Sequence, residues 1–244
     1  MELHLKGKRV LVTGASKGIG RACVEVLSGE GCMVLGASRT IAAGAQSRPA
    51  DLSARGAAEE LAAWAGDIDI LVNNAGAIPG GDLQGVDEDT WRRAWDLKVF
   101  GYINLTRAVY AGMKKKKRGV IVNILGNAGE RLNAAYIAGS TANAGLMAFT
   151  RTLGGVSHAD GIRVLGINPG PVATDRLVSL YQQMAQTKLG DAKRYQELFK
   201  EMSFGRPATP EEIASAVAFL ASDRSAYTSG CILSIDGGLA SRWG

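Results

Sequence analysis

The chain has 244 residues, and its 28 lysines and arginines against 23 aspartates and glutamates give a formal net charge of +5. Hydrophobic residues make up 46% and charged residues 21%, which is typical of a globular protein and argues against a disordered chain. None of the apolar runs approaches the length of about 18 residues that a membrane span needs. Since the N-terminus is also too mixed for a signal peptide, we expect a cytoplasmic protein with no membrane partner.

Residues that would indicate other classes of protein are sparse. The three cysteines, Cys23, Cys32 and Cys231, are isolated, which excludes a disulfide framework and a Cys-x-x-Cys redox or metal pair. With only two histidines besides, we expect no metal site. The basic run at residues 114–118 is interpreted as the solvated C-terminal end of a helix, and the small net charge does not require a nucleic-acid partner.

Strands and helices are expected to alternate along the whole chain. Short apolar runs predict buried parallel strands, and apolar residues at helical spacing predict the helices between them. This order implies a single α/β domain over residues 1–244, in which helices cover both faces of a doubly wound parallel sheet of about seven strands. We expect strands at 10–13, 33–37, 68–72, 120–124, 164–167 and 232–235, and helices at 20–27, 55–64, 89–113, 141–155 and 211–220.

A glycine-rich turn, Thr13-Gly14-Ala15-Ser16-Lys17-Gly18-Ile19-Gly20, follows the first strand and opens the first helix. Glycines let the backbone turn sharply and approach a pyrophosphate, and the helix N-terminus supplies free N–H groups and positive dipole charge. This context favours a bound dinucleotide over a merely structural turn. We expect contacts to it from Gly14, Ser16, Lys17, Gly18, Ile19 and Gly20.

The end of the second strand distinguishes NADP(H) from NAD(H). An acidic side chain there would hold the ribose hydroxyls of NAD(H), but the sequence reads Ala37-Ser38-Arg39-Thr40. Arg39 can pair with a 2′-phosphate through two hydrogen bonds, and Lys17 adds a second cation. We therefore expect NADP(H) as the cofactor, with Ser38 and Arg39 beside it; the alternative is that Arg39 only caps a surface turn.

Two stretches depart from the regular alternation. Only eleven residues separate Arg39 from Asp51, which is short for a parallel crossover that contains a helix, so we predict a shortened or missing helix there. Residues 176–204 carry no strand signal and a loose helical pattern, and they interrupt the path between two core elements. We interpret them as a lid over the substrate.

Three motifs together resemble the classical short-chain dehydrogenase/reductase family. They are the glycine turn, Asn73-Asn74-Ala75-Gly76 after a strand, and Asn168-Pro169-Gly170-Pro171-Val172-Ala173-Thr174. The resemblance covers essentially the whole chain. It implies a nicotinamide-dependent Rossmann fold that acts on a small-molecule substrate and forms a homotetramer or dimer. It also implies cofactor contacts from Asp51 and Leu52 at the adenine, from Asn73, Ala75 and Gly76 at the ribose, and from Pro169, Gly170, Val172 and Thr174 around the nicotinamide.

The family's catalytic Asn, Ser, Tyr and Lys are all substituted in the ungapped alignment. Anchors at residues 122–124 and 144–149 place Gly126 where the family has Ser, Gly139 where it has Tyr and Asn143 where it has Lys. The Asn place is Lys98. The Asn and Lys places lie close together in the family's fold. In this chain they hold Lys98 and Asn143, which are the same two residue types in exchanged positions.

Two arrangements of the catalytic residues remain open. A three-residue deletion would put Tyr136 at the Tyr place, but Ser140 would then stand at the Lys place. Without it, Tyr136 lies one helical turn before the Tyr place and can face the same cavity. The working hypothesis is a rearranged site, in which Tyr136 donates the proton beside the Lys98 charge, while Asn143 and Ser140 orient Lys98 and the substrate oxygen. The opposing interpretations are that Tyr136 is an ordinary helix-start aromatic and that Lys98 faces solvent or binds only the cofactor ribose.

These observations favour an NADP(H)-dependent oxidoreductase that interconverts an alcohol and a carbonyl. The apolar side chains of residues 176–204 favour a small apolar or aromatic substrate. The alternative is a catalytically impaired dinucleotide-binding protein, a sensor or assembly partner on the same fold, because fold does not imply function. A lyase-like or dehalogenase-like reaction ranks last, since family members of that kind lose the cofactor pocket.

Overall fold

The computed structural model describes residues 1–41 and 43–242. Its strands are β1 (Arg9–Thr13), β2 (Met33–Ser38), β3 (Gln46–Pro49), β4 (Ile70–Asn73), β5 (Gly119–Ile124), β6 (Ile162–Pro169) and β7 (Ile232–Ile235). Its α-helices are α1 (Gly18–Gly29), α2 (Ala57–Ala65), α3 (Glu88–Trp95), α4 (Gly101–Lys116), α5 (Ile137–Val156), α6 (Asp175–Leu189) and α7 (Pro210–Ala221).

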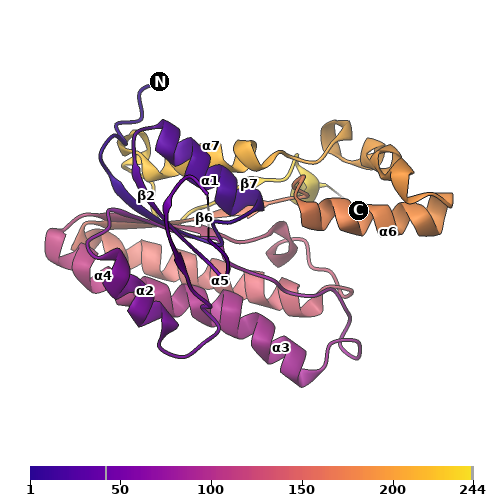
Figure 1. Cartoon of the computed structure of the whole chain (residues 1–244), viewed down its shortest axis with the longest axis horizontal. Coiled ribbons are helices and arrows are strands. Elements are labelled where there is room, and N and C mark those ends of the chain that lie inside the picture. The colour runs from indigo at the N-terminus through magenta and orange to yellow at the C-terminus, as the bar shows by residue number, and fades with distance from the viewer. Residues whose placement is uncertain (42, 243–244) are drawn as a thin grey trace.

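The strands form one parallel sheet in the order β3-β2-β1-β4-β5-β6-β7. Figure 1 shows α1 and α7 over one face and α2, α4 and α5 over the other. The predicted three-layer, doubly wound α/β fold is therefore confirmed. The strand order reverses between β1 and β4, and ligands of such sheets bind at the carboxyl ends of the strands beside this point.

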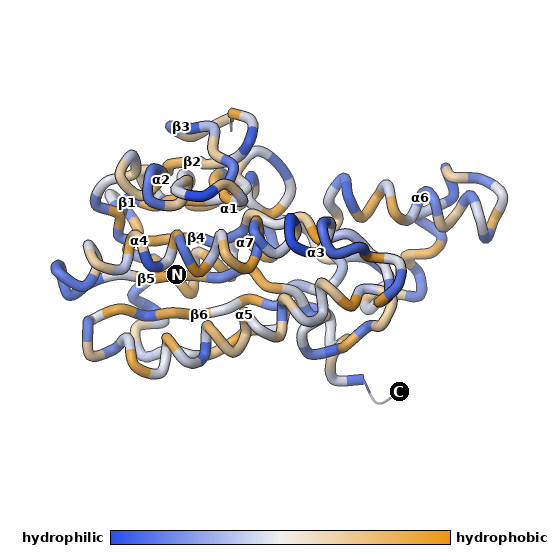
Figure 2. The backbone as a smooth tube through the Cα atoms, turned by 90° about the horizontal axis from the view of Figure 1, so that it is seen from below, coloured by the Kyte–Doolittle hydropathy of each residue, from blue (hydrophilic) through white to orange (hydrophobic). Residues whose placement is uncertain are grey.

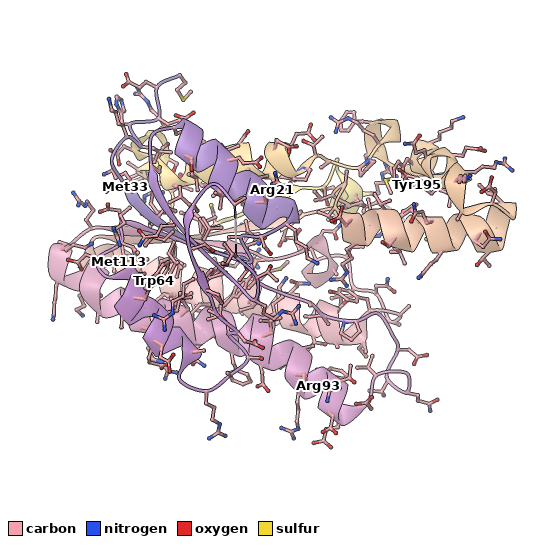
Figure 3. All side chains as sticks on the ribbon, viewed as in Figure 1. Arg21, Met33, Trp64, Arg93, Met113 and Tyr195 are labelled. Carbon is pink, nitrogen blue, oxygen red and sulfur yellow. The ribbon has the colours of Figure 1, made fainter. Side chains whose placement is uncertain are left out.

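Apolar side chains fill both layers between the sheet and its helices. Val10 and Val12 pack into the cluster under α1 and α7, whereas Leu11 between them faces the cluster under α2 and α4, and all three are fully buried. Figure 2 shows hydrophobic residues along the central strands and hydrophilic ones along α3. In Figure 3 the side chain of Arg93 points away from the body, while Met113 belongs to the buried cluster. This packed frame holds the loops at the carboxyl ends of the strands.

The edge strand β3 was not predicted. It has the sequence Gln46-Ser47-Arg48-Pro49 and no fully buried residue, so it lacks the apolar run that marks a central strand. Proline is tolerated because this is an edge strand. No helix connects β2 to β3 among the described residues of the connection, which exclude residue 42, so the prediction of a shortened or missing helix is confirmed there.

The long helix predicted at residues 89–113 is instead three joined segments. A π-helix, Asp96–Phe100, stands between α3 and α4, so the chain continues without a break from Glu88 to Lys116. One-turn π segments inside α-helices are rare and often lie at functional sites. Lys98 is the middle residue of this turn, which gives the lysine an orientation that regular helical periodicity could not predict.

Residues 176–204 form helical structure that extends away from the sheet (Figure 1). α6 packs along a 3₁₀ segment, Ala192–Glu201. Tyr181 and Phe199 join the two with ring centroids 5.1 Å apart, and Tyr195 lies 5.6 Å from Phe199. The segment therefore has a small hydrophobic core of its own, outside the main one.

Several cations of the basic run at the end of α4 pair with nearby carboxylates. Lys114 and Lys117 lie 3.2 and 3.8 Å from Asp160, and Arg118 lies 2.9 Å from Asp69. These ion pairs support the interpretation of residues 114–118 as the charged C-terminal end of a helix. Within the described part of the chain, no helix is long and apolar enough to cross a membrane, and no group of three or more His, Cys, Asp or Glu residues could hold a metal ion.

Candidate active site

The glycine turn after β1 is a close-packed cradle. A Cβ on Gly14 would lie 2.8 Å from the side-chain nitrogen of Asn74, and one on Gly20 would lie 2.1 Å from the Gly14 carbonyl oxygen. Gly14 and Gly18 also have φ angles of +64° and +55°, which side chains with a Cβ rarely adopt. Lys17 at the start of α1 makes no side-chain cap. The first N–H groups of α1 are therefore available to an anion such as a pyrophosphate.

Asn74 and Thr13 hold this turn against the loop after β4. Asn74 Nδ2 donates to the carbonyl oxygens of Thr13 and Gly14 at 3.0 and 3.3 Å. The Thr13 hydroxyl oxygen accepts from the backbone N–H groups of Asn74 and Ala75 at 2.9 and 3.1 Å. These bonds set the distance between the glycine turn and the loop that faces it.

A groove of about 410 Å³ runs past this cradle along the carboxyl ends of the strands. Among the described residues that line it, Asp175 is the one carboxylate, so none follows β2. The lining includes eleven of the predicted cofactor residues: Gly14, Ser16, Lys17, Gly18, Ile19, Ser38, Arg39, Leu52, Ala75, Gly76 and Thr174. The glycine cradle and this donor set fit a dinucleotide.

The other predicted cofactor residues lie elsewhere. Gly20 is packed beneath the turn, and Pro169, Gly170 and Val172 line a neighbouring cavity. The Asp51 carboxylate caps its own turn, accepting from Ser53 N and Oγ at 3.0 and 2.7 Å. These hydrogen bonds are the main reason that the pKa of Asp51 lies below its usual value.

Asn73 is fully buried and holds the frame behind the groove. Its Nδ2 donates to Thr106 Oγ1 at 3.1 Å and to Asn123 Oδ1 at 2.9 Å, and Asn123 in turn donates to Thr150 Oγ1 at 2.9 Å. This chain of bonds joins β4 and β5 to α4 and α5. The bonds give Asn73 a structural role in the central sheet, and it does not line the groove where the family resemblance implied a ribose contact.

A second cavity, of about 330 Å³, adjoins the groove and shares Ile19, Asn74, Gly76, Thr174 and Arg176 with it. We call it the reaction cavity. Three of the predicted catalytic residues line it: Tyr136, Lys98 and Asn143. They come from the start of α5, the π-helix and the second turn of α5, so the tertiary structure brings together what the sequence separates.

Lys98 reaches the reaction cavity from the π-helix. Its Nζ donates to the Leu125 carbonyl oxygen at 2.9 Å, and its stem runs beside Gly76, where a Cβ would lie 2.9 Å from Lys98 Cδ. Burial of the ammonium group, together with the positive charge of Arg176, lowers the pKa of Lys98 to about 8. A larger residue at position 76 would block this path. Lys98 thus points inward and not to solvent.

Tyr136 occupies the space that a glycine leaves open. A Cβ on Gly139 would lie 2.0 Å from Cζ of the Tyr136 ring, so the ring crosses directly over this glycine. The backbone around the tyrosine is fixed from both sides. Gly81 donates to the Ala135 carbonyl at 2.8 Å and accepts from the N–H of Ile137 at 3.2 Å. The Tyr136 ring therefore covers Gly139, the position that the sequence analysis aligned with the family's tyrosine.

Asn143 and Ser140 are placed differently from each other. Asn143 Nδ2 donates to the Gly139 carbonyl oxygen at 2.8 Å, while its Oδ1 is buried with no partner among the described residues. Ser140 is not among the residues that line the reaction cavity. Its hydroxyl oxygen instead accepts from Asn133 N at 3.1 Å, which anchors the loop before Tyr136. A direct contact of Ser140 with substrate does not follow from this geometry.

Sequence reasoning did not identify Arg176 as a site residue. Its guanidinium donates to the Ile78 carbonyl oxygen, and it lines both the groove and the reaction cavity. The one indication in the sequence is that Arg176 stands two residues after the motif that ends at Thr174, which is weak evidence for a role in the site. Asn127 also lines the reaction cavity.

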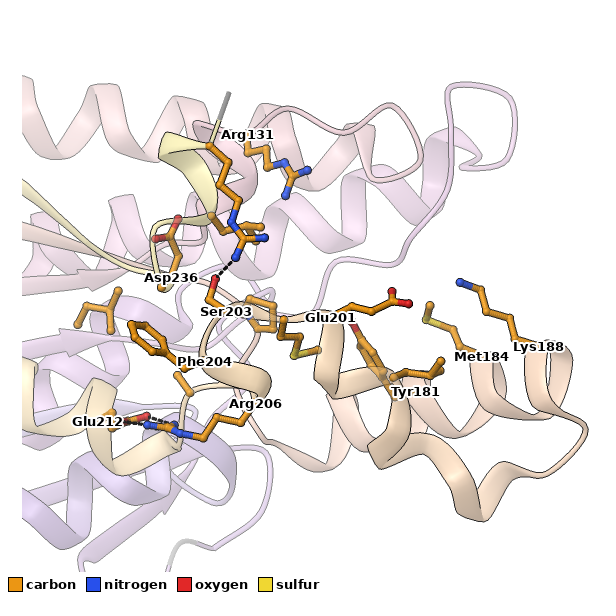
Figure 4. Close-up of a pocket in the computed structure, with 18 residues that line it drawn as sticks. Arg131, Tyr181, Met184, Lys188, Glu201, Ser203, Phe204, Arg206, Glu212 and Asp236 are labelled. Carbon is orange, nitrogen blue, oxygen red and sulfur yellow. Dashed lines mark hydrogen bonds and ion pairs between the residues drawn. The ribbon is translucent and has the colours of Figure 1, made fainter. Parts of the chain in front are cut away.

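A larger cavity, of about 580 Å³, lies between residues 176–204 and the C-terminal segment (Figure 4). Two of its arginines already have partners. Arg206 pairs with Glu212 at 2.7 Å, and Arg242 donates to Ser203 Oγ at 2.7 Å. None of the predicted catalytic or cofactor residues lines it. Its size alone does not make it the site of the reaction.

Comparisons with known proteins agree with this geometry. The family model that matches residues 14–240 is described as enoyl-(acyl carrier protein) reductase. The 3-oxoacyl-(acyl-carrier-protein) reductase of Vibrio cholerae is 33% identical over 252 aligned residues, covering 97% of this chain and 99% of that protein. The corresponding reductase of Escherichia coli is also 33% identical, with the same coverage.

Solved structures are similar over the whole chain. L-sorbose reductase from Gluconobacter frateurii, complexed with NADPH and L-sorbose, has a TM-score of 0.92 and 28% identity, with 100% of both chains covered. Ligand-free aldohexose dehydrogenase from Thermoplasma acidophilum has a TM-score of 0.89 and 28% identity, covering 100% of this chain and 98% of that one. The resemblance therefore includes the segment at residues 176–204.

Proposed function

This chain belongs to the short-chain dehydrogenase/reductase family and is an NAD(P)-dependent oxidoreductase, and we propose that it uses NADP(H) to interconvert an alcohol and a carbonyl on a small substrate. The observation that carries the proposal is the meeting of Tyr136, Lys98 and Asn143 in one cavity beside the dinucleotide groove. The apolar Leu177 and Leu180 of α6 line the same cavity and favour a substrate with an apolar or aromatic part.

The choice of NADP(H) is supported by charge. Arg39 and Lys17 line the groove, and no carboxylate from the end of β2 lies there to repel a 2′-phosphate. An arginine is well suited to the phosphate because its planar fork can make two parallel hydrogen bonds. The bound NADPH of L-sorbose reductase points in the same direction.

In the proposed mechanism, Tyr136 donates the transferred proton and Lys98 contributes a positive charge. When bound, the nicotinamide supplies or accepts the hydride. In reduction, the Tyr136 hydroxyl gives its proton to the carbonyl oxygen, and the Lys98 ammonium stabilises the negative charge left on the phenol oxygen. The Leu125 carbonyl holds Lys98 in place, and Asn143 lines the cavity with its Nδ2 bonded to the Gly139 carbonyl oxygen. Ser140 acts through the loop that it anchors.

The test of this mechanism is a pair of variants, Tyr136→Phe and Lys98→Met. Each should lower kcat for carbonyl reduction by about 10²- to 10⁴-fold, because each removes a group that acts on the transferred proton. Affinity for NADPH, measured by calorimetry, should change by no more than about threefold, since both side chains lie outside the cradle. Unchanged turnover in either variant would remove that residue from the mechanism. NADPH binding with no turnover on a broad panel of carbonyls would favour a non-catalytic dinucleotide-binding protein.

A further inference from the structure

The reaction cavity carries two positive charges and no negative one. Lys98 and Arg176 line it, and none of the described residues that line it is an aspartate or a glutamate. Each cation donates to a neutral backbone carbonyl, of Leu125 and of Ile78 respectively. Elsewhere in the molecule, cations such as Arg206 and Arg118 have carboxylate partners.

Like charges in a partly buried cavity disfavour each other, and an anion bound between them relieves that cost. Lys98 and Arg176 line the same cavity, and the charge of Arg176 contributes to the lowered pKa of Lys98. A carboxylate accepts hydrogen bonds from a guanidinium in a well-defined geometry. The cavity thus offers two cations, with no carboxylate among its described lining residues, to an anionic group.

The pyrophosphate of the cofactor has its own positive environment. The glycine cradle offers the uncapped N-terminus of α1, and Lys17 lies beside it. Lys98, Tyr136 and Asn143 do not line that groove, whereas Arg176 lines both the groove and the reaction cavity. An anion that satisfies both Lys98 and Arg176 therefore has to enter the reaction cavity, where the substrate is proposed to bind.

We propose that the substrate of this enzyme is a small oxo acid, and that Arg176 is the residue that selects its carboxylate. The inference rests on the proposed function and narrows its substrate class. The volume of about 330 Å³ suits a small molecule, and Leu177 and Leu180 would cover its apolar or aromatic part. In the reaction the substrate carbonyl carbon accepts a hydride and its oxygen accepts a proton. The oxo acid becomes a hydroxy acid while NADPH is oxidised to NADP⁺.

The experiment compares two aromatic substrates that differ in one charge, benzoylformate and its methyl ester. The wild-type enzyme should prefer benzoylformate. Arg176→Gln should lower kcat/KM for benzoylformate by about 10- to 100-fold, the value of a hydrogen bond to a charged group, while the ester changes by less than about threefold. Arg176→Lys should restore part of the preference. Arg194→Gln is the control, because Arg194 pairs with Glu197 on the surface of the same segment.

Binding of non-reducible probes separates this inference from the proposed reaction. With NADP⁺ present, benzoate should bind to the wild type by calorimetry, benzamide should not, and Arg176→Gln should abolish the difference. If benzoate binds in this way but no carbonyl is reduced, the anion site stands and the proposed reaction fails. If Arg176→Gln lowers kcat/KM equally for benzoylformate and its ester, the inference is overturned. It is also overturned if the variant weakens NADPH binding but keeps the preference for benzoylformate, because Arg176 then serves the cofactor.

Discussion

Gly139 and Tyr136 form a pair in which the small residue makes room for the large one. The ring can cross α5 only because residue 139 has no side chain. The glycine is therefore part of the site although it carries no functional group. The proposed alignment assigns the family's tyrosine place to Gly139, and the ring of Tyr136, from one turn earlier, lies over that glycine.

We expect Gly139→Ala to displace the Tyr136 ring, because the new Cβ would lie 2.0 Å from a ring carbon. Turnover should fall by at least about tenfold, and overpacking should lower the free energy of unfolding by about 1–3 kcal/mol. Gly145→Ala is the control on the same helix, since its Cβ would meet no atom within 4 Å. That variant should keep its activity and gain up to about 1 kcal/mol from better helix propensity. Retained activity in Gly139→Ala would show that the ring position does not matter.

Lys98 makes the reaction sensitive to pH. Its pKa is lowered from 10.5 to about 8 by burial and by Arg176, so the ammonium is lost as pH rises through about 8. If the charged form assists proton transfer, kcat for reduction should fall above that pH. Lys98→Arg keeps its charge and should move the fall to higher pH. A wild-type profile that stays flat between pH 7 and 9.5, measured by NADPH oxidation, would exclude a role for the charge.

The same shift predicts how stability depends on pH. The pKa of Lys98 is lower in the folded than in the unfolded chain, so between about pH 8 and 10.5 the unfolded chain binds more protons. Stability therefore rises with pH through this window, and the neutral amine relieves the cost of burying a charge. Relative to Lys98→Met, the wild type should gain up to about 3 kcal/mol between pH 7 and 10.5 in urea unfolding. A difference between the two proteins that does not change with pH would contradict the buried charge.

Among the elements, the start of α5 and the π-helix position the groups that we propose as catalytic. The π-helix turns Lys98 toward the strand ends. Ser140 ties the start of α5 to the loop from β5 through Asn133, and the loop after β4 pairs with the same place at Gly81. The loops after β4 and β5 thus meet at the start of α5 and hold the site together.

Ser140→Ala should loosen this anchor without removing any group from the reaction cavity. The lost hydrogen bond should cost about 0.5–1.5 kcal/mol of unfolding free energy. Turnover should fall only a few-fold, with the pH profile unchanged. Thr141→Ala is the control, because that hydroxyl donates only to Ile137 within its own helix. A loss in Ser140→Ala as large as in Tyr136→Phe would mean that the serine acts on the substrate directly.

For the molecule as a whole, ligand binding and stability are linked through the groove. The cradle, the end of β2 and the loop after β4 line it together, so a dinucleotide bridges several parts of the sheet. A ligand at 100 times its Kd stabilises the folded state by about 2.7 kcal/mol. The preference for one dinucleotide is therefore measurable by unfolding alone, without any substrate.

NADPH should raise the free energy of unfolding more than NADH does at the same concentration. Arg39→Ser should weaken NADPH binding by about 10- to 100-fold and leave NADH binding nearly unchanged, because only NADPH carries the 2′-phosphate. The control is Arg48→Ser, since Arg48 lies on the neighbouring edge strand, 3.8 Å from Glu60, and does not line the groove. Equal stabilisation of the wild type by both dinucleotides would remove the proposed preference.

The sequence alone was enough to predict the layered α/β sheet, the dinucleotide cradle and most of the groove. Those features depend on local patterns: apolar runs, glycines beside a strand end, and an arginine in place of an acidic residue directly after Ser38. It also indicated Tyr136 and Lys98 as partners, but only through a resemblance and an assumed exchange. The polar edge strand β3 left no local signal of this kind.

The cavity itself came only from the three-dimensional packing of segments far apart in the chain. The inward turn of Lys98 at a π-helix and the placement of Arg176 in the same cavity depend on contacts between different elements. Local periodicity carries no record of such contacts, because Gly76, Leu125 and Arg176 lie 22, 27 and 78 positions from Lys98 along the chain. The charges of Lys98 and Arg176 share one cavity because the chain folds so that strand ends and loops meet there. Their spacing along the sequence does not show it.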